Sequence, residues 1–295
     1  MKCWCNGKIL SNPVPLDSFN YTLHYSAPSA WEGIRSYVQD DGTCVIWKLR
    51  DHCERLKDSA KILGFEIPYT VGEIEQACRD LVTANGNGNF YLRPIAYSTL
   101  AAEGIHQAKQ TISLDIYCVP VPKLHGKSGK EIKMVISNLV RSYPQYQMQA
   151  KTPANYQVVQ LAQPIMKQTG VDDIFLIDAQ GYVVEATVAN FFVFKGDVAM
   201  TPPNRGSILP GITRRCVAEI LNDRSLMFSK YKKAPMVIEK DITRSDIYTA
   251  DCIILCGTFA EIVKVKEVDG RQIDGNQFYA DMLKTEYDLM VRGRR

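Results

Sequence analysis

The sequence contains no apolar run that approaches the ~20 residues needed to span a bilayer. Its first residues, Met1-Lys2-Cys3-Trp4, lack the apolar core of a signal peptide. The formal net charge is only +3, and the basic residues are scattered apart from Arg292-Gly293-Arg294-Arg295, which is typical of a frayed tail. These absences predict a protein with no membrane span and no nucleic-acid partner.

The cysteines lack the pairing that a metal site or a disulfide framework would need. There are nine of them, an odd number, and they are spread without metal-type spacing. Cys3 and Cys5 alternate as residues on one face of a strand do, which favours reduced strand cysteines over a zinc site. The pattern predicts a reducing, cytoplasmic setting and no metal.

What is present is enough apolar sequence for two domains. The chain has 295 residues, of which 46% are hydrophobic. No internal repeat or low-complexity segment interrupts it. A polar, glycine-containing stretch from His125 to Lys130 is the best linker candidate. We therefore expect a first domain at residues 1–124, a linker at 125–131 and a second domain at 132–295.

Hydrophobic periodicity and turn signals place the elements. They predict a hairpin at residues 3–10 and strands at 32–38, 44–47, 90–97, 111–119, 132–137, 173–177, 182–184, 190–195, 198–201, 252–256 and 262–265. They predict helices at 51–63, 71–84, 154–168, 212–221 and 276–291. In the last helix we expect Phe278, Met282, Tyr287 and Met290 to be buried. Short strands interleaved with a few helices indicate an α+β fold.

Lys151 is the first candidate for chemistry. Small residues and Pro153 crowd it, and Tyr156 follows about one helical turn later. A single lysine is usually a solvated surface charge. A lysine held in a partly desolvated place instead has a depressed pKa and is a usable nucleophile or Schiff-base amine. We interpret Lys151 as a lysine of this second kind.

Glu185 is the second candidate, because it closes an apolar strand and precedes small residues. A carboxylate beside so much apolar surface needs a partner. The ordinary partner is a structural arginine or a backbone N–H. The functional alternative is the protonated ring nitrogen of pyridoxal phosphate, which a carboxylate keeps charged.

Two further stretches are suited to an anion. Pro210 and Gly211 precede a helical pattern, so backbone N–H groups and the helix dipole could bind a phosphate, with the Thr213 hydroxyl beside them. An ordinary capped helix would give the same pattern. Gly257-Thr258 ends a predicted strand and offers N–H groups and a hydroxyl in the same way.

These motifs, in this order, resemble those of the fold-type IV pyridoxal-phosphate enzymes, and most closely the branched-chain amino acid aminotransferases. The resemblance covers nearly the whole chain. The stretches that carry it are Glu32-Gly33-Ile34-Arg35-Ser36-Tyr37, Arg55-Leu56, Tyr91-Leu92-Arg93-Pro94, Lys151-x-x-x-Asn155-Tyr156, Glu185 with Asn190, Leu209-Pro210-Gly211-Ile212-Thr213-Arg214 and Gly257-Thr258.

The resemblance implies a smaller N-terminal α/β domain, a larger C-terminal pseudo-barrel domain, pyridoxal 5'-phosphate as cofactor and at least a homodimer. Lys151 would carry the cofactor and move the substrate proton, Glu185 would pair with the ring nitrogen, and Tyr156 would bind the phenolic oxygen. The other implied cofactor contacts are Arg55, Leu209, Ile212, Thr213 and Thr258. The implied substrate contacts are Tyr25, Trp31, Tyr91, Arg93, Gly257 and Phe259.

The implied reaction is transamination of leucine, isoleucine and valine with 2-oxoglutarate. Two departures from the family pattern bear on it: Ala189 stands where the family often has a polar residue, and residues 96–110 do not resemble the usual pocket loop. The alternatives are a D-amino acid or (R)-amine aminotransferase, an aminodeoxychorismate lyase, and a binding protein that keeps the fold without the cofactor.

Overall fold

The computed structural model describes residues 1–26, 28–106, 111–121, 131–141 and 148–294. The chain divides into two units, Met1–Pro122 with Ala150–Asn155, and Lys123–Gln149 with Tyr156–Arg295. The segment that carries Lys151 is therefore grouped with the first unit, whereas the sequence interpretation put it in the second domain. The expected linker at 125–131 lies outside the described residues except for Glu131, so its position stays a prediction.

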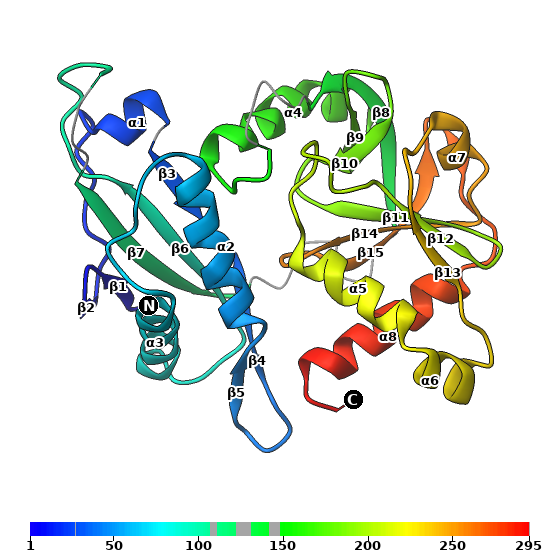
Figure 1. Cartoon of the computed structure of the whole chain (residues 1–295), viewed down its shortest axis with the longest axis horizontal. Helices are drawn as coiled ribbons and strands as arrows, with labels where there is room; N and C mark the ends of the chain where they lie inside the picture. Colours follow the sequence, from blue (N-terminus) through cyan, green and yellow to red (C-terminus); the bar gives the residue numbers. More distant parts are fainter. Residues whose placement is uncertain (27, 107–110, 122–130, 142–147, 295) are drawn as a thin grey trace. The chain divides into compact units, whose positions relative to one another are not determined.

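The first unit is a sheet with two long helices (Figure 1). Its strands follow the order β2-β1-β7-β6-β4-β5, with β3 beside β6. The strands are β1 (Cys3–Cys5), β2 (Lys8–Leu10), β3 (Ser29–Trp31), β4 (Ile34–Val38), β5 (Cys44–Ile46), β6 (Phe90–Ser98) and β7 (Ile112–Pro120). The helices are α1 (Tyr21–Tyr25), α2 (Leu49–Ile62) and α3 (Val71–Ala84).

Strand alternation separates the core of this unit from its candidate site. Leu92 and Ile116 belong to the apolar cluster that also contains Leu56 of α2 and Leu81 of α3. Because successive strand residues point to opposite faces, Tyr91 and Arg93 point away from that core. The hairpin predicted at residues 3–10 is confirmed, with an antiparallel pair of strands joined by residues of positive φ.

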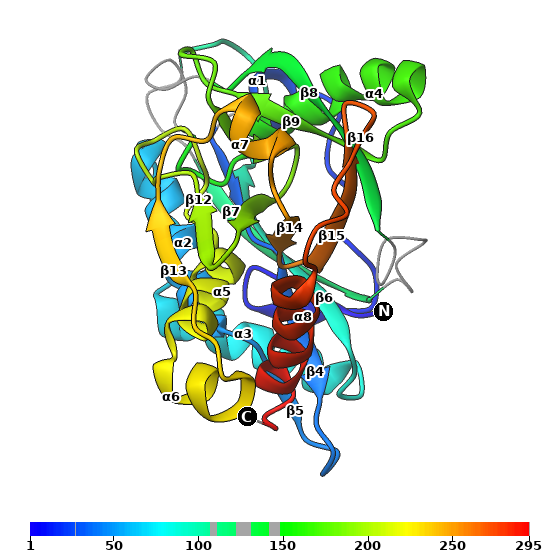
Figure 2. The ribbon, with the colours of Figure 1, turned by 90° about the vertical axis from the view of Figure 1, so that its right-hand side faces the viewer.

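The second unit is built on a larger, curled sheet (Figures 1 and 2). Its order is β10-β9-β8-β15-β14-β11-β12-β13, with β16 beside β15. The strands are β8 (Ile132–Val140), β9 (Asp173–Ile177), β10 (Val183–Ala186), β11 (Asn190–Lys195), β12 (Val198–Thr201), β13 (Met236–Glu239), β14 (Cys252–Gly257), β15 (Glu261–Val268) and β16 (Arg271–Gln272). Its helices are α4 (Gln157–Thr169), α5 (Ile212–Asn222), α6 (Arg224–Leu226), α7 (Arg244–Tyr248) and α8 (Phe278–Val291), with a π-helical turn at Met227–Tyr231.

Packing of α5 and α8 on this sheet positions the second half of the candidate site. Figure 2 shows α8 beside β14 and β15, and α5 contacts both α8 and β14. The buried face of α8 differs in part from the prediction. Met282 and Tyr287 are buried as expected, but Tyr279 and Leu283 complete that face in place of Phe278 and Met290, which are half-buried. Mixed helices and a curled sheet agree with the predicted α+β fold.

Among the helices that the structure describes, none combines the length and the apolar character that crossing a bilayer requires.

Candidate functional site

The backbone of Lys151 is fixed from both sides within the first unit. Its N–H donates to Ser59 Oγ of α2 at 3.0 Å, and its carbonyl accepts the N–H of Trp31 at 2.9 Å. The side chain is only 8% exposed, and Nζ lies 4.1 Å from the centre of the Trp31 ring. The structure therefore places a buried amine at a fixed position against an aromatic face, as the lysine interpretation requires.

Arg55 forms a bidentate ion pair with Glu32, which is fully buried. Arg55 Nε donates to Oε1 at 2.6 Å and Nη2 donates to Oε2 at 2.9 Å. His52 Nδ1 lies 2.7 Å from the same Oε2. Burial alone would raise the pKa of Glu32, but the charges of Arg55 and His52 and their hydrogen bonds lower it well below its ordinary value.

His52 is buried as well, one helical turn before Arg55. Burial lowers the pKa of His52 against the opposing effect of Glu32, and the charges of Arg55 and Lys151 lower it further. Since Arg55 already neutralises Glu32, we interpret His52 as a neutral imidazole whose Nδ1–H donates to the carboxylate. The Lys151 amine thus lies near a charge-balanced group of three side chains.

Three of the expected substrate contacts lie together near Lys151. The guanidinium carbon of Arg93 lies 4.4 Å from the centre of the Trp31 ring and 5.5 Å from that of Tyr91. Gly33 lies directly under the phenol, because a Cβ at that position would overlap Tyr91 Oη and lie 2.7 Å from Cζ. Burial raises the pKa of Tyr91. Tyr25, the fourth expected contact, ends α1 with its ring packed on Tyr21.

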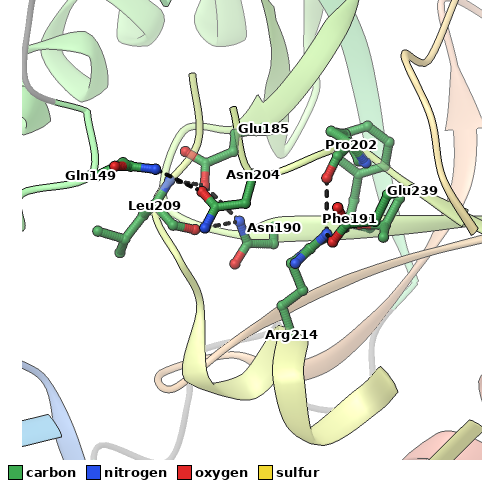
Figure 3. A network of polar contacts seen from close by, with 10 residues as sticks. Gln149, Glu185, Asn190, Phe191, Pro202, Asn204, Leu209, Arg214 and Glu239 are labelled. Carbon is green, nitrogen blue, oxygen red and sulfur yellow. Dashed lines mark hydrogen bonds and ion pairs between the residues drawn. The ribbon is translucent and has the colours of Figure 1, made fainter. Parts of the chain in front are cut away.

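Glu185 in the second unit is buried and surrounded by hydrogen-bond donors (Figure 3). Oε1 accepts Asn190 Nδ2 at 2.6 Å and the N–H of Leu209 at 2.9 Å. Oε2 lies 3.0 Å from Nε of Arg141, which is also buried. These donors favour the charged carboxylate in an apolar surrounding. The ordinary partners considered for Glu185, an arginine and a backbone N–H, are thus both present.

The N-terminus of α5 has the form that the Pro210-Gly211 pattern predicts. Gly211 is its N-cap and offers no side chain to cap it, and Ile212 and Thr213 are the first helical residues, both buried. The first N–H groups of a helix have no partner within it, so this turn is suited to an anion. The Leu209 N–H that binds Glu185 precedes the turn by two residues.

The turn after β14 lies at the same end of the sheet. Cys256, which precedes Gly257, is paired with Asn190 of β11. Thr258 and Phe259 follow in the turn to β15, where Phe259 is 43% exposed. Tyr156 ends the short 3-10 helix Pro153–Tyr156 and precedes α4. The second unit therefore brings Glu185, Leu209, Ile212, Thr213, Gly257 and Thr258 toward one end of its sheet.

Sequence reasoning missed three residues of this arrangement. Arg141 follows β8 and pairs with Glu185, and Ser59 holds the Lys151 backbone. His52 shares α2 with Arg55 at a spacing of three residues, which places both on one helix face. That spacing is the only sequence signal among the three, because Arg141 and Ser59 are far along the chain from their partners.

Comparisons with known proteins agree with the sequence motifs. Residues 29–268 match the family described as Amino-transferase class IV. A branched-chain-amino-acid aminotransferase of Escherichia coli (strain K12) is 30% identical over 275 residues, which are 92% of this chain and 85% of that protein.

Solved structures are similar over the whole chain. The branched-chain aminotransferase of Thermoproteus uzoniensis, crystallised with norvaline, is 30% identical and superposes with a TM-score of 0.90, covering 100% of this chain and 96% of that one. A branched-chain amino acid aminotransferase from the source designated T.th., complexed with N-(5'-phosphopyridoxyl)-L-glutamate, is 28% identical, with a TM-score of 0.88, and the match covers 100% and 95% of the two chains.

The buried His52 predicts a specific loss of stability in acid. Its pKa in the folded protein lies below the unfolded value of about 6.5, so the unfolded chain binds more protons below that pH. Stability is complete above about pH 6.5 and falls as the pH drops toward the folded pKa, by at most ~1.4 kcal/mol per pH unit. His52→Asn should flatten this slope in urea unfolding measured between about pH 8 and 5.

His24, which is exposed in α1, supplies the matched control: His24→Asn should keep the wild-type slope. Glu32 does not confuse the result, because its contribution is lost only as pH falls below its unfolded value of about 4.3. An unchanged slope in His52→Asn would show that His52 is charged in the folded protein.

Proposed function

The chain belongs to the class IV amino-transferase family, and on that basis we propose that it transfers the amino group of leucine, isoleucine or valine to 2-oxoglutarate with pyridoxal 5'-phosphate as cofactor. The Escherichia coli relative is named for branched-chain amino acids, and one similar solved structure contains a phosphopyridoxyl group joined to glutamate. The observation that carries the proposal is the buried Glu185 carboxylate in the same unit as the open N-terminus of α5.

The donor set of the second unit fits the two ends of this cofactor. A charged, buried carboxylate suits a protonated pyridine nitrogen, and the uncapped first turn of α5 suits a phosphate. Ile212 and Thr213 would give their N–H groups to the phosphate, with the hydroxyl of Thr258 beside them. Leu209 would pack on the ring and Tyr156 would bind its phenolic oxygen.

Lys151 would hold the cofactor and move the proton. When bound, pyridoxal phosphate supplies an aldehyde and a ring that accepts the electron pair of the broken Cα–H bond. Lys151 Nζ takes the proton from the substrate Cα as a base and returns it as an acid. Its fixed backbone and its contact with Trp31 support this role, because proton transfer requires a short and constant reach.

The remaining residues of the first unit would bind phosphate and substrate. Arg55 would contact the phosphate while Glu32 holds its guanidinium in one orientation. Trp31 and Tyr91 offer an apolar surface that suits branched aliphatic side chains, and Tyr25 would add to it. Arg93 would bind the second carboxylate of glutamate.

The turn after β14 would bind the substrate carboxylate. Backbone N–H groups of Gly257, Thr258 and Phe259 in a turn suit such an anion. Both substrates of the reaction carry this α-carboxylate, so the same contact would serve each half-reaction.

A panel of amino donors tests the reaction. L-Leucine, L-isoleucine and L-valine with 2-oxoglutarate should each yield glutamate, with kcat/KM at least ~10-fold above that for D-alanine or a simple chiral amine, because the apolar pocket discriminates by side chain. Coupled detection of glutamate gives the rates. Preference for D-alanine or the amine would replace the branched-chain assignment, and release of pyruvate from aminodeoxychorismate would indicate a lyase.

Replacement of Lys151 tests the chemical step. Lys151→Ala should lower turnover of leucine by at least ~10³-fold, since it removes both the attachment point and the base. The protein should also lose the visible absorbance of lysine-bound cofactor, while its unfolding midpoint stays close to that of the wild type. Lys61→Ala, at an exposed position of α2, is the control and should keep both activity and colour.

We also propose that the protein acts as a homodimer. Support comes from exposed apolar side chains of the first unit around α1, namely Val14, Leu16, Phe19, Leu23 and Ile105, which are between 47% and 60% exposed. Hydrogen bonds from Ala102 to Phe19 and from Tyr21 to Ile105 join the two segments that carry them. An apolar cluster of this kind is typical of an interaction surface.

Sedimentation measurements test the assembly. The wild type should sediment as a dimer, and Leu23→Glu should shift it toward the monomer because the new charge would be buried without a partner. Val45→Glu, at a 40% exposed position of β5, is the control and should leave the dimer intact. A monomeric wild type at micromolar concentration would reject the proposal.

A further inference from the structure

Asn190 connects the two parts of the second unit that the proposed function assigns to opposite ends of the cofactor. It is the first residue of β11 and only 6% exposed. Its Nδ2 donates to Glu185 Oε1 at 2.6 Å and to the carbonyl of Leu209 at 3.1 Å (Figure 3). Because both partners are acceptors, the amide must present its NH₂ group to them, and Oδ1 points elsewhere.

The Oδ1 atom occupies the space above Gly211. A Cβ added to Gly211 would overlap Asn190 Oδ1 and lie 3.0 Å from its Cγ. The backbone of Gly211 does not itself require glycine, since φ −70° and ψ 127° are extended values that any residue adopts. Glycine is therefore required at the N-cap of α5 by the Asn190 side chain and not by the helix.

A single side chain thus touches the carboxylate, the chain before the helix and the helix N-cap. The Leu209 N–H reaches the same carboxylate oxygen, so the two residues close a small ring of hydrogen bonds. An amide has no titrating group near neutral pH, so this connection does not change with protonation. The short contact at Gly211 makes it sensitive to the size of both residues.

We propose that Asn190 is a positioning residue that sets the distance between Glu185 and the first turn of α5, and so matches the site to a ligand with a cationic ring nitrogen at one end and a phosphate at the other. The inference rests on the proposed function, because it concerns how the same site accepts pyridoxal phosphate. It adds the reason for the asparagine–glycine combination, which neither residue explains alone.

A double-mutant cycle on the apoprotein tests the contact. Gly211→Ala should weaken pyridoxal phosphate binding by about tenfold or more, because the new Cβ displaces the amide, and Asn190→Ala should weaken it by a similar factor. The double variant should bind as well as Asn190→Ala alone, since removal of the amide makes room for the Cβ. Multiplication of the two losses in the double variant would overturn the inference.

A second ligand separates positioning from local damage. Inorganic phosphate needs only the α5 turn, so Asn190→Ala should leave its binding within about twofold of the wild type while pyridoxal phosphate binding falls. An equal loss for both ligands would mean that Asn190 only supports the helix, and would overturn the inference. Asn204→Ala, which removes an exposed amide bonded to Gln149 at 3.0 Å, is the matched control and should change neither.

Further outcomes are distinguishable. If Gly211→Ala does not fold, the double variant should still fold and bind like Asn190→Ala, and its failure to do so would contradict the proposed contact. If the wild type itself does not bind pyridoxal phosphate, the proposed function fails and this inference fails with it. If the wild type binds and the cycle is additive, only the inference fails.

Discussion

The second unit is constrained above all by the need to keep the Glu185 carboxylate paired inside an apolar sheet. A buried charge costs several kcal/mol unless hydrogen bonds and an opposite charge replace water. Arg141 after β8, Asn190 from β11 and the Leu209 N–H before α5 supply them. Three separate segments must therefore meet at one carboxylate. That requirement leaves a rigid charge facing any ligand that the site binds.

The first unit meets the same requirement in another way. Glu32 is held by both nitrogen positions of the Arg55 fork and by His52, so its charge is cancelled locally. Arg141 meets Glu185 through a single Nε contact. A carboxylate held by one contact to a cation retains more of its field than one held by a fork. This difference suits Glu185 to a second cationic partner and Glu32 to the orientation of an arginine.

Local signals explain which elements could be predicted. α3 begins and ends where predicted, at residues 71 and 84, because Thr70 and Glu73 form a capping box and a glycine-rich turn follows. β11 and β12 also have their predicted bounds. β13 was missed because it is a half-exposed edge strand that depends on parallel pairing with β12. α8 was misread because Glu286 is buried through its contacts with Lys230 and Tyr231.

The candidate site divides along the same line. Lys151, Glu185 and the Pro210-Gly211 turn each have a pattern in their own neighbourhood, so the sequence was sufficient to find them. The partners that hold them are far away in the chain, and only folding brings them together. Gly211 shows the limit most clearly. Its place before a helix suggested free N–H groups for an anion, which the structure supports. The reason that it must be glycine lies twenty-one residues earlier, in the amide oxygen of Asn190.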